Sequence, residues 1–362
     1  MIRVLQCVNN MHRAGLETML MNYYRHMDRT QIQFDFLTHR PERADYDDEI
    51  ERLGGRVYYA PRLYPHHYAA YFSFMTKFFQ EHPEYQIMHS HIDAMSYLPL
   101  LAGKRAGVPI RITHSHSTSI DKDLKYPLKL FFKARMLTAA NQCAACGEAA
   151  GQFLFGGHEF ELIPNAIDAQ RFRFDAKMRA EMRQQLALDG KLVLGHVGRF
   201  CYPKNHEFLI EIFRRVLQRR PDAVLLLVGT GEKEEKIQTL TDAYGMTEAV
   251  RFLGSQADVS PFYQAMDVFV MPSLFEGVPL TGVEAQYALL PCVFSDRVPQ
   301  EVAFTDRCSF VPLEKSADQW AEAILRAIPA ERHALQIADN RYDIHEASGL
   351  LADYYHRLLS GL

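Results

Sequence analysis

Short apolar runs alternate with amphipathic segments along almost the whole chain of 362 residues. The apolar runs have the length of strands and are bounded by turn residues, whereas the segments between them carry an apolar residue every three or four positions, as helices do. Strands separated by single helices form parallel sheets with helices on both faces. Because 362 residues exceed the usual size of one domain, the alternation predicts an α/β protein with two doubly wound, Rossmann-like domains.

The predicted elements divide at Pro164-Asn165-Ala166-Ile167-Asp168, which places a first domain over residues 1–168 and a second over 169–345. In doubly wound domains ligands bind at the carboxyl ends of the strands, so the loops that follow strands are candidate sites. The expected strands cover residues 2–8, 33–38, 56–59, 87–90, 110–114, 141–146, 160–163, 192–197, 224–228, 250–253, 268–271 and 291–294, and the main expected helices cover 16–26, 47–53, 68–80, 97–106, 127–139, 208–217, 280–290 and 346–359.

Residues 271–301 hold two glutamates, Glu276 and Glu284, where an apolar strand leads through a loop into a helix. The free N–H groups and the dipole at such a helix start favour an anion. Carboxylates would repel a phosphate, but they accept hydrogen bonds from neutral hydroxyls beside it, such as those of a sugar and a ribose. The segment therefore predicts a nucleotide-sugar site, with Glu276 on the sugar, Glu284 on the ribose, and contacts from Gly277, Val278, Pro279 and Leu280.

Two cations follow another predicted strand, at 192–197. Gly198 ends this strand, and Arg199 and Lys204 lie in the loop before a helix of regular apolar spacing. Two fixed positive charges at the end of a sheet suit a diphosphate, whose charge must be neutralised when the glycosidic bond breaks. The alternative is a strand end with two solvated cations, and the neighbouring glutamate segment favours the diphosphate.

The two segments together resemble the large family 4 group of retaining glycosyltransferases with the GT-B architecture. Residues 276–285 match the pattern EGxPLxxxEA, and residues 198–205 match GRxxxxKN. The resemblance implies two Rossmann-like domains facing an interdomain cleft, a UDP-sugar as donor, and no metal or other cofactor. It also implies attack on the front face of the sugar, with the departing phosphate taking the acceptor proton. A final helix in residues 346–362 is expected to cross back to the first domain.

The resemblance assigns further residues of the second, donor-binding domain. Gly229 and Gly231 lie in a turn similar to the family's loop that lines the nucleotide. Phe252 and Leu253 follow a predicted strand and correspond to the edge that meets the base. A dinucleotide fingerprint is the alternative for this turn, but Glu234 occupies the place of its last glycine.

In the first domain the resemblance is less complete. Gly15 and Glu17 correspond to a glycine-rich loop that meets acceptor and donor, but Ala14 replaces the first glycine, so an ordinary strand-to-helix turn remains the alternative. The turn at residues 164–168 resembles the family's PNGID turn, with Ala166 in the place of the glycine, which leaves the local backbone there open.

Four histidines follow two predicted strands of the first domain: His89 and His91 in one segment, and His114 and His116 in another. The resemblance implies that a histidine at the end of the second strand contacts the transferred sugar. On this basis His114 is the first candidate and His91 the second. A metal site is the alternative, but only Asp93 lies at ligand spacing, so we expect none.

The composition narrows the classes of partner. The net charge of −4 is unlike that of nucleic-acid-binding proteins, which are usually basic, so nucleic acid is not an expected partner. The chain has six cysteines without a disulfide framework, and Cys143-x2-Cys146 has no second pair for a zinc site. With no apolar run of transmembrane length and no signal-peptide pattern at the start, a reduced cytosolic protein is expected.

The segment 122–136 combines Lys122, Lys125, Lys129 and Lys133 in one helical stripe with Leu124, Leu128, Phe131 and Phe132 beside them. A basic amphipathic helix with aromatic residues is typical of the surface of an anionic membrane. The alternative is a core helix that shows its lysines to water.

Together with these observations, the resemblance implies a retaining, metal-independent glycosyltransferase that acts in surface polysaccharide biosynthesis. It would move a sugar from a UDP-sugar to a saccharide or lipid-linked saccharide, at the inner face of the membrane if the basic segment binds lipid. Two alternatives share the nucleotide site: a UDP-sugar 2-epimerase, which needs acid and base carboxylates in the first domain, and a non-catalytic nucleotide-sugar-binding subunit.

Overall fold

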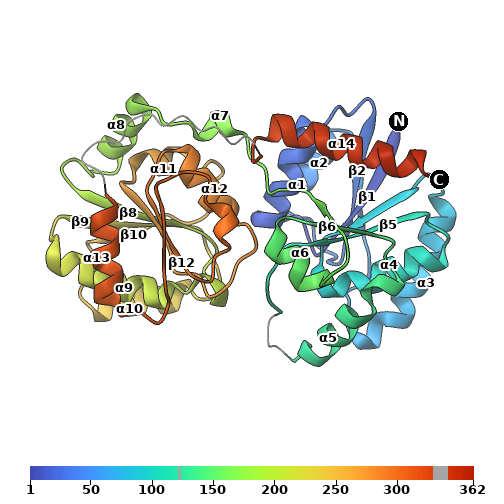
Figure 1. Ribbon diagram of the computed structural model, residues 1–362, viewed down its shortest axis with the longest axis horizontal. Helices are drawn as coiled ribbons and strands as arrows, with labels where there is room; N and C mark the ends of the chain where they lie inside the picture. The colour runs from blue at the N-terminus through green and yellow to red at the C-terminus, as the bar shows by residue number, and fades with distance from the viewer. Residues whose placement is uncertain (121–123, 329–340) are drawn as a thin grey trace. The chain divides into compact units, whose positions relative to one another are not determined.

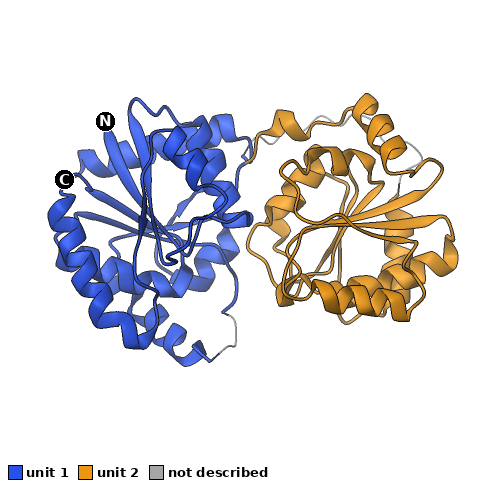
Figure 2. Cartoon of the chain, turned by 180° about the vertical axis from the view of Figure 1, so that it is seen from behind, with its two compact units in different colours: residues 1–166, 341–362 blue, residues 167–340 orange. Residues whose placement is uncertain are grey.

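The computed structural model describes residues 1–120, 124–328 and 341–362. The chain forms two compact units (Figure 2), of which unit 1 comprises Met1–Ala166 and Arg341–Leu362, and unit 2 comprises Ile167–Asn340. The boundaries between the units therefore lie at 166/167 and 340/341. The sequence analysis placed them at 168/169 and 345/346.

Unit 1 is a parallel seven-stranded sheet with the strand order β3-β2-β1-β4-β5-β6-β7 (Figure 1). The middle strands are buried along almost their whole length, polar residues included, as expected where helices cover both faces of a parallel sheet. The strands are β1 (Ile2–Val8), β2 (Ile32–Thr38), β3 (Val57–Tyr59), β4 (Ile87–Ser90), β5 (Ile110–Ser115), β6 (Gln142–Ala145) and β7 (Glu161–Leu162). The helices are α1 (Gly15–His26), α2 (Asp47–Arg52), α3 (Tyr68–Glu81), α4 (Tyr97–Arg105), α5 (Tyr126–Arg135), α6 (Glu148–Phe155) and α14 (Ile344–Ser360).

Unit 2 is a parallel six-stranded sheet with the order β10-β9-β8-β11-β12-β13. Its strands are β8 (Leu192–Val197), β9 (Ala223–Val228), β10 (Val250–Phe252), β11 (Val268–Met271), β12 (Cys292–Ser295) and β13 (Cys308–Val311). Its helices are α7 (Ala169–Phe172), α8 (Ala176–Gln185), α9 (His206–Arg219), α10 (Glu234–Ala243), α11 (Ser260–Ala265), α12 (Leu280–Tyr287) and α13 (Ala317–Ala327).

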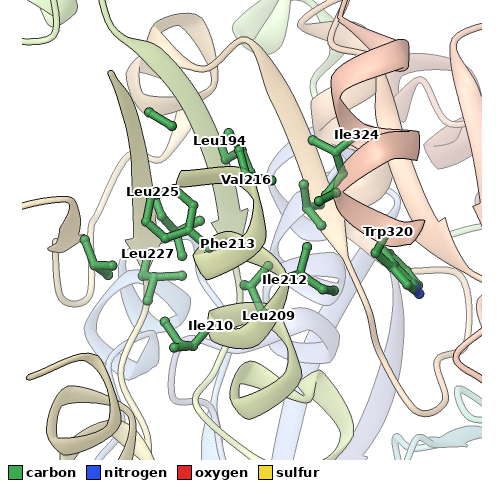
Figure 3. Packing of buried hydrophobic residues seen from close by; sticks show 14 of the residues in the cluster. Leu194, Leu209, Ile210, Ile212, Phe213, Val216, Leu225, Leu227, Trp320 and Ile324 are labelled. Atoms are coloured by element: carbon green, nitrogen blue, oxygen red, sulfur yellow. The ribbon is translucent and has the colours of Figure 1, made fainter. Parts of the chain in front are cut away.

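The core of unit 2 shows why these segments become helices and strands. Helix α9 buries Leu209, Ile212, Phe213 and Val216, which lie on one face at helical spacing. This face packs on α13, whose Trp320 is fully buried, and on the apolar strands β8 and β9 (Figure 3). The cluster thus joins α9 and α13 to the sheet of unit 2.

Helix α14 belongs to unit 1, as the resemblance implied for the end of the chain. It packs against α1, and its Tyr355 is fully buried, with its ring edge-on to Phe34 of β2. A segment more than three hundred residues from β1 in the sequence thus completes the first unit.

Two predicted helices end earlier than expected, and some observed elements were not predicted. The helix expected at 280–290 stops at Tyr287, and Leu289 has a positive φ of 58°, so the chain has already turned toward Pro291. The helix expected at 127–139 ends at Arg135, before a 3-10 turn. Strand β13 and helix α13 lack a counterpart in the sequence prediction.

The turn at residues 164–168 accommodates Ala166 without strain. Ala166 is fully buried and is not among the described residues with positive φ, so its methyl group costs no left-handed conformation. Asn22 Nδ2 donates to Ala166 O at 3.0 Å and Tyr23 Oη donates to Pro164 O at 2.7 Å, which fastens the turn to α1.

Candidate active site

The strand order of unit 2 reverses direction between β8 and β11, which makes the loops after these two strands the expected ligand site. These are the loops that carry the predicted cations and glutamates. They are joined directly: Leu274 N donates to Pro203 O at 2.7 Å, and Asn205 Nδ2 donates to Pro272 O at 3.0 Å. Asn205 has a left-handed backbone, φ 54°, which asparagine tolerates better than most residues.

Glycines at the end of β9 let a third loop approach the first. A Cβ added to Gly229 would lie 2.2 Å from Gly198 O, and one added to Gly231 would lie 2.5 Å from Phe200 O. The close backbones are joined by hydrogen bonds from Phe200 N to Thr230 O and from Lys233 N to Phe200 O, both 3.0 Å. Gly229 and Gly231 therefore position the loop of Arg199 by their small size, whatever they contact in addition.

Lys204 and Glu276 form a direct ion pair, with 2.8 Å between Nζ and Oε1. Both side chains are largely buried, at 16% and 12% exposed. A sequence pattern assigns Lys204 to a phosphate and Glu276 to a sugar without showing that the two meet. Their contact places a fixed positive charge and a fixed acceptor side by side, as is needed where a sugar is joined to a diphosphate.

Arg199 differs from Lys204 although the sequence treats them alike. Its side chain is 63% exposed and lies 3.9 Å from Glu232, a loose pair in water. Gly198, directly before Arg199, lies close to the Lys204 side chain: a Cβ added to Gly198 would be 3.3 Å from it. Of the two predicted cations, Lys204 is thus the preorganised one, and Arg199 is free to reorient toward an anion.

Two buried histidines lie behind these cations without adding charge. Burial lowers the pKa of His196 to about 4 and that of His206 to about 2. His196 Nδ1 lies 2.8 Å from Val270 O, and the His206 ring stacks on Phe200. Both rings are neutral at physiological pH, so the positive charge of these loops comes from arginine and lysine.

Glu284 lies on the first turns of α12, and its side chain is buried. Tyr263 Oη donates to Glu284 Oε2 at 2.7 Å. Burial raises the pKa of this carboxyl to about 7, and the tyrosine hydroxyl opposes the shift without cancelling it. The carboxyl is therefore poised between its two protonation states near neutral pH, a property that the sequence does not reveal.

Helix α12 begins directly after the loop for which the sequence predicted an anion site. Pro279 precedes the helix and forms no side-chain cap, and its carbonyl oxygen accepts from Gly282 N at 3.0 Å and Val283 N at 3.2 Å. Val278 and Leu280 are buried and Gly277 is half-buried. At the end of β10, Leu253 N donates to Leu227 O, and the Phe252 ring stacks on that of Phe200 with 6.0 Å between the ring centres.

We expect UDP to bind more tightly to the wild type as pH rises through the pKa of Glu284, because the ionised carboxyl accepts hydrogen bonds from hydroxyls that the neutral form accepts less well. Glu284→Gln should remove this dependence. Calorimetric titration of UDP at pH values on either side of about 7 measures it, and the difference between variant and wild type cancels the ionisation of UDP itself. An unchanged pH profile in the variant would remove Glu284 from the nucleotide site.

The raised pKa of Glu284 should also make the free energy of unfolding depend on pH. The unfolded chain loses the Glu284 proton near 4.5 and the folded chain near 7, so between these values the unfolded state binds fewer protons. The free energy of unfolding should therefore fall by about 3 kcal/mol across this window as pH rises. Urea titrations of wild type and Glu284→Gln over the same window separate this contribution from the rest of the protein.

In unit 1, the predicted glycine loop opens α1. A Cβ added to Gly15 would meet nothing within 4 Å, so no close approach requires glycine there. Glu17 is buried in the first turn of the helix, and the preceding Ala14 forms no side-chain cap. The structure thus shows a strand-to-helix turn with a buried acidic residue, in which no neighbouring atom requires a glycine.

The four histidines at the carboxyl ends of β4 and β5, two within the strands and two directly after them, gather in one cluster. His91 and His114, which the sequence analysis assigned to contact with the sugar, are both buried, and their rings lie beside those of His89 and His116. His89 Nε2 lies 3.1 Å from His114 Nδ1, and His91 Nδ1 lies 3.0 Å from His116 Nε2.

Exposure distinguishes the two histidines of β5. His114 is fully buried within the sheet, and His116, just beyond the strand end, is the partly exposed one. His116 N donates to Asp93 Oδ1 at 2.9 Å, which fixes the strand end. A ligand at the end of β5 would meet His116 before His114, a distinction that two histidines two residues apart do not make in a sequence.

The cluster also has the geometry of a metal site. Ligand nitrogens of His89, His91 and His114 all lie within 4.8 Å of one another. Imidazole suits zinc and other transition metals. Each of these rings nevertheless makes at least one hydrogen bond within the cluster or to Gln6 or Tyr355, which is an arrangement that neutral rings satisfy among themselves.

Comparisons with known proteins agree with this geometry. Residues 13–171 match the family "Glycosyltransferase Family 4", and residues 178–343 match "Glycosyl transferases group 1". EpsF of Bacillus subtilis (strain 168), which is named as a glycosyltransferase, is 35% identical over 98% of this chain and 96% of its own length. A crystal structure of Anabaena HepE with UDP and glucose superposes with a TM-score of 0.81 at 18% identity, over 98% of this chain and 100% of that one.

A second relative is 27% identical over 59% of this chain and 58% of its own length, and is named UDP-Gal:alpha-D-GlcNAc-diphosphoundecaprenol alpha-1,3-galactosyltransferase from Escherichia coli. The two family matches together cover both units, and the match to EpsF runs through nearly the whole chain. The chain therefore belongs to the family 4, group 1 glycosyltransferases, with the GT-B fold.

Proposed function

We propose that this glycosyltransferase moves a sugar from a UDP-sugar to a saccharide or lipid-linked saccharide in surface polysaccharide biosynthesis, with retention of the anomeric configuration and without a metal. The observation that carries the donor assignment is the buried Lys204–Glu276 pair at the reversal point of unit 2, with Arg199 and Glu284 in the adjoining elements. A nucleoside diphosphate needs the cations, and its ribose and sugar need the carboxylates.

The names of the relatives support the finer statements. The Escherichia coli relative is named for a UDP-galactose donor and a diphosphoundecaprenol-linked acceptor, and HepE was crystallised with UDP-glucose. Another relative, CapH of Staphylococcus aureus, is named for capsular polysaccharide biosynthesis. From these names we take a UDP-sugar as the donor, and from the Escherichia coli relative a lipid-linked saccharide as one class of acceptor, as proposals for this chain.

Retention is supported by how the carboxylates are held. Glu276 is paired to Lys204 and Glu284 is hydrogen-bonded by Tyr263, so each is occupied in positioning. Front-face attack needs no carboxylate nucleophile: the departing diphosphate accepts the proton of the attacking hydroxyl while Lys204 and Arg199 stabilise its growing charge. Exclusion of water during this step favours transfer over hydrolysis.

The experiment that tests the proposal is a donor panel. The protein is incubated with UDP-glucose, UDP-galactose, UDP-N-acetylglucosamine and their GDP counterparts, with and without a chelator, and with lipid-linked saccharide extracts. We expect UDP release from one donor, an α-linked product, and an unchanged rate with the chelator. An epimerised donor would instead identify the 2-epimerase alternative, and unchanged donors throughout would identify a non-catalytic subunit. A rate abolished by the chelator would contradict the metal-free mechanism.

The basic segment of unit 1 supports contact with an anionic membrane, although not in the arrangement expected from the sequence. Lys122 lies outside the described residues. Leu128 and Phe132 pack into the core of the unit, whereas Leu130 and Phe131 are 44% and 52% exposed on α5. Leu124 and Leu137, before and after the helix, are exposed as well. The outward face of the segment is therefore apolar.

The lysines flank this apolar face. Lys125 Nζ lies 4.2 Å from the centre of the Tyr64 ring, and Lys133 Nζ lies 3.8 Å from that of Phe153. Apolar side chains between cations suit insertion into the headgroup boundary of an anionic bilayer. No helix among the described residues is long and apolar enough to cross a membrane.

We expect the wild type to sediment with vesicles that contain anionic lipid at low salt. Leu130→Ser combined with Phe131→Ser should abolish sedimentation, because it removes the inserting side chains. Lys125→Glu, Lys129→Glu and Lys133→Glu together should abolish it as well, since each cation contributes about 1 kcal/mol near such a surface. Leu350→Ser, at an exposed leucine of α14, is the matched control and should bind like the wild type. Wild type that stays in the supernatant would point to a soluble acceptor.

A further inference from the structure

The histidine cluster of unit 1 is joined to two residues that no sequence motif marked, Gln6 of β1 and Tyr355 of α14. Burial lowers the pKa of all four histidines, for His89 and His116 to about 3, so each ring is neutral at physiological pH. A neutral imidazole has one N–H donor and one acceptor nitrogen. Every hydrogen bond in the cluster therefore constrains which nitrogen of its ring carries the proton.

One half of the cluster is oriented through Tyr355. Gln6 Nε2 donates to Tyr355 Oη at 3.3 Å, so the tyrosine has its own proton left to donate. His89 Nδ1 lies 2.8 Å from Tyr355 Oη and accepts this proton, which places the His89 proton on Nε2. His89 Nε2 then donates to His114 Nδ1 at 3.1 Å, so the His114 proton is also on Nε2.

The other half is oriented by the carbonyl of the same glutamine. Gln6 Oε1 lies 2.8 Å from His91 Nε2, and because a carbonyl oxygen only accepts, His91 carries its proton on Nε2. His91 Nδ1 is then an acceptor and takes the Nε2 proton of His116 at 3.0 Å. His116 is left with a bare Nδ1.

All six groups thus form one directed series of hydrogen bonds with two ends. At one end, His116 Nδ1 has a lone pair that accepts no hydrogen bond from the part of the chain that the structure describes. At the other end, His114 Nε2 carries a buried proton that is likewise without a partner among the described residues. The two end rings are stacked, with 4.1 Å between their centres.

We propose that Gln6 and Tyr355 are positioning residues that lock the four histidines in a single tautomeric pattern, so that His116 always presents Nδ1 as a hydrogen-bond acceptor to a hydroxyl group of the sugar substrate. An isolated imidazole exchanges its tautomers, so its Nδ1 would be a donor for part of the time. A locked ring is preorganised for a hydroxyl donor. The choice of a sugar as ligand rests on the proposed function, whereas the tautomeric pattern does not.

The pattern gives α14 a role beyond packing. Its Tyr355 provides the hydroxyl that connects the two halves, and its neighbour Tyr354 does not take part in the series. The two tyrosines are adjacent and both buried, and the Tyr354 hydroxyl has no hydrogen-bond partner among the described residues. Tyr354→Phe is therefore a matched control for Tyr355→Phe.

The first test is nuclear magnetic resonance of the full chain labelled with ¹⁵N in its histidine rings, in which two-bond correlations distinguish the tautomers. We expect all four rings to carry their proton on Nε2. Tyr355→Phe should release His89 and His114 into mixed tautomers and leave His91 and His116 unchanged. Gln6→Met should release all four rings, because the amide of Gln6 orients both Tyr355 and His91. Tyr354→Phe should leave all four as in the wild type.

Two results would overturn the tautomeric pattern. One is an Nδ1 proton on any of the four rings of the wild type. The other is a stoichiometric zinc or other transition metal in the purified protein, found by elemental analysis, because His89, His91 and His114 would then be metal ligands. The spectra also report whether each variant keeps its fold, since the other histidines among the 16 of the chain serve as internal references.

The second test addresses the ligand. With the donor and acceptor found by the panel, analogues that lack one hydroxyl at a time are compared in wild type and Gln6→Met. Gln6→Met should lower kcat/KM by about tenfold, the size of one misplaced hydrogen bond. One deoxy analogue should show a similar loss with the wild type and no further loss with the variant. If every analogue loses as much with the variant as with the wild type, His116 does not read a hydroxyl.

Failure of this inference and failure of the proposed function have different signatures. If the protein turns over no nucleotide sugar but all four rings carry their proton on Nε2, the proposed function and the sugar ligand are wrong, and the single tautomeric pattern is supported. If the wild type transfers a sugar but its four rings show mixed tautomers, the proposed function is supported and the single tautomeric pattern is wrong.

Discussion

Replacing Lys204 by alanine is expected to weaken UDP binding and sugar transfer together, each by about 10² to 10³-fold, or about 2.7–4 kcal/mol. The side chain is largely buried and fixed by its pair with Glu276, so its charge acts in a partly desolvated place and needs no reorganisation. The substitution also leaves the Glu276 carboxylate without its cation, and this unpaired charge repels the diphosphate. Binding is measured by calorimetry with UDP, and transfer by product formation from the donor identified by the panel.

Lys236→Ala is the matched control, because Lys236 is also a lysine of unit 2 but pairs with Glu207 on the surface. We expect it to bind UDP like the wild type. Arg199→Ala should have a smaller effect than Lys204→Ala, since Arg199 is mostly exposed and its charge is screened by water. A Lys204→Ala enzyme that binds UDP with wild-type affinity would exclude a diphosphate at this loop.

The second large effect is expected from Glu276→Gln, and here binding and catalysis should separate. The amide keeps the shape of the side chain but loses the charge that accepts hydrogen bonds from the sugar, so kcat/KM should fall by about 10² to 10³-fold. UDP itself carries no such sugar. Its affinity should stay the same or increase, because Lys204 loses its competing partner and its charge becomes available to the phosphate.

Glu232→Gln provides the comparison for this experiment. Glu232 is exposed and lies beside Arg199, so the same chemical change occurs at the rim of the same loops. We expect a wild-type kcat/KM for this variant within about threefold, the range of a surface ion pair. If Glu276→Gln loses UDP affinity and transfer to the same extent, the carboxylate belongs to the nucleotide and not to the sugar.

The fold was predictable because the pattern that specifies it is local. The apolar runs of β8 and β11 and the amphipathic spacing of α9 are visible in the residues themselves, and a strand–helix alternation allows few topologies. The elements that the sequence prediction missed or misplaced have weaker local signals. Strand β13 is a half-buried edge strand, and the end of α12 is decided by the turn at Leu289 rather than by any helix-stopping glycine.

The candidate donor residues were predictable for a related reason. Lys204 and Glu276 each follow a strand, and parallel strands bring their carboxyl ends to one edge of a sheet, so two distant loops were expected to share a site. Their roles could not be ranked from the sequence. Whether Arg199 or Lys204 is buried, and whether Glu284 has an ordinary or a raised pKa, depends on packing by residues elsewhere in the chain.

By itself the sequence determined the α/β class, the two doubly wound units, the family and the loops that hold the charged residues, because these depend on spacing along the chain. Only the tertiary structure decided which of these groups meet. It paired Lys204 with Glu276, exposed Leu130 and Phe131, and connected the histidines of two strands through Gln6 and Tyr355. Hydrogen bonds and burial join residues by distance in space, and that distance becomes known only when the chain is folded.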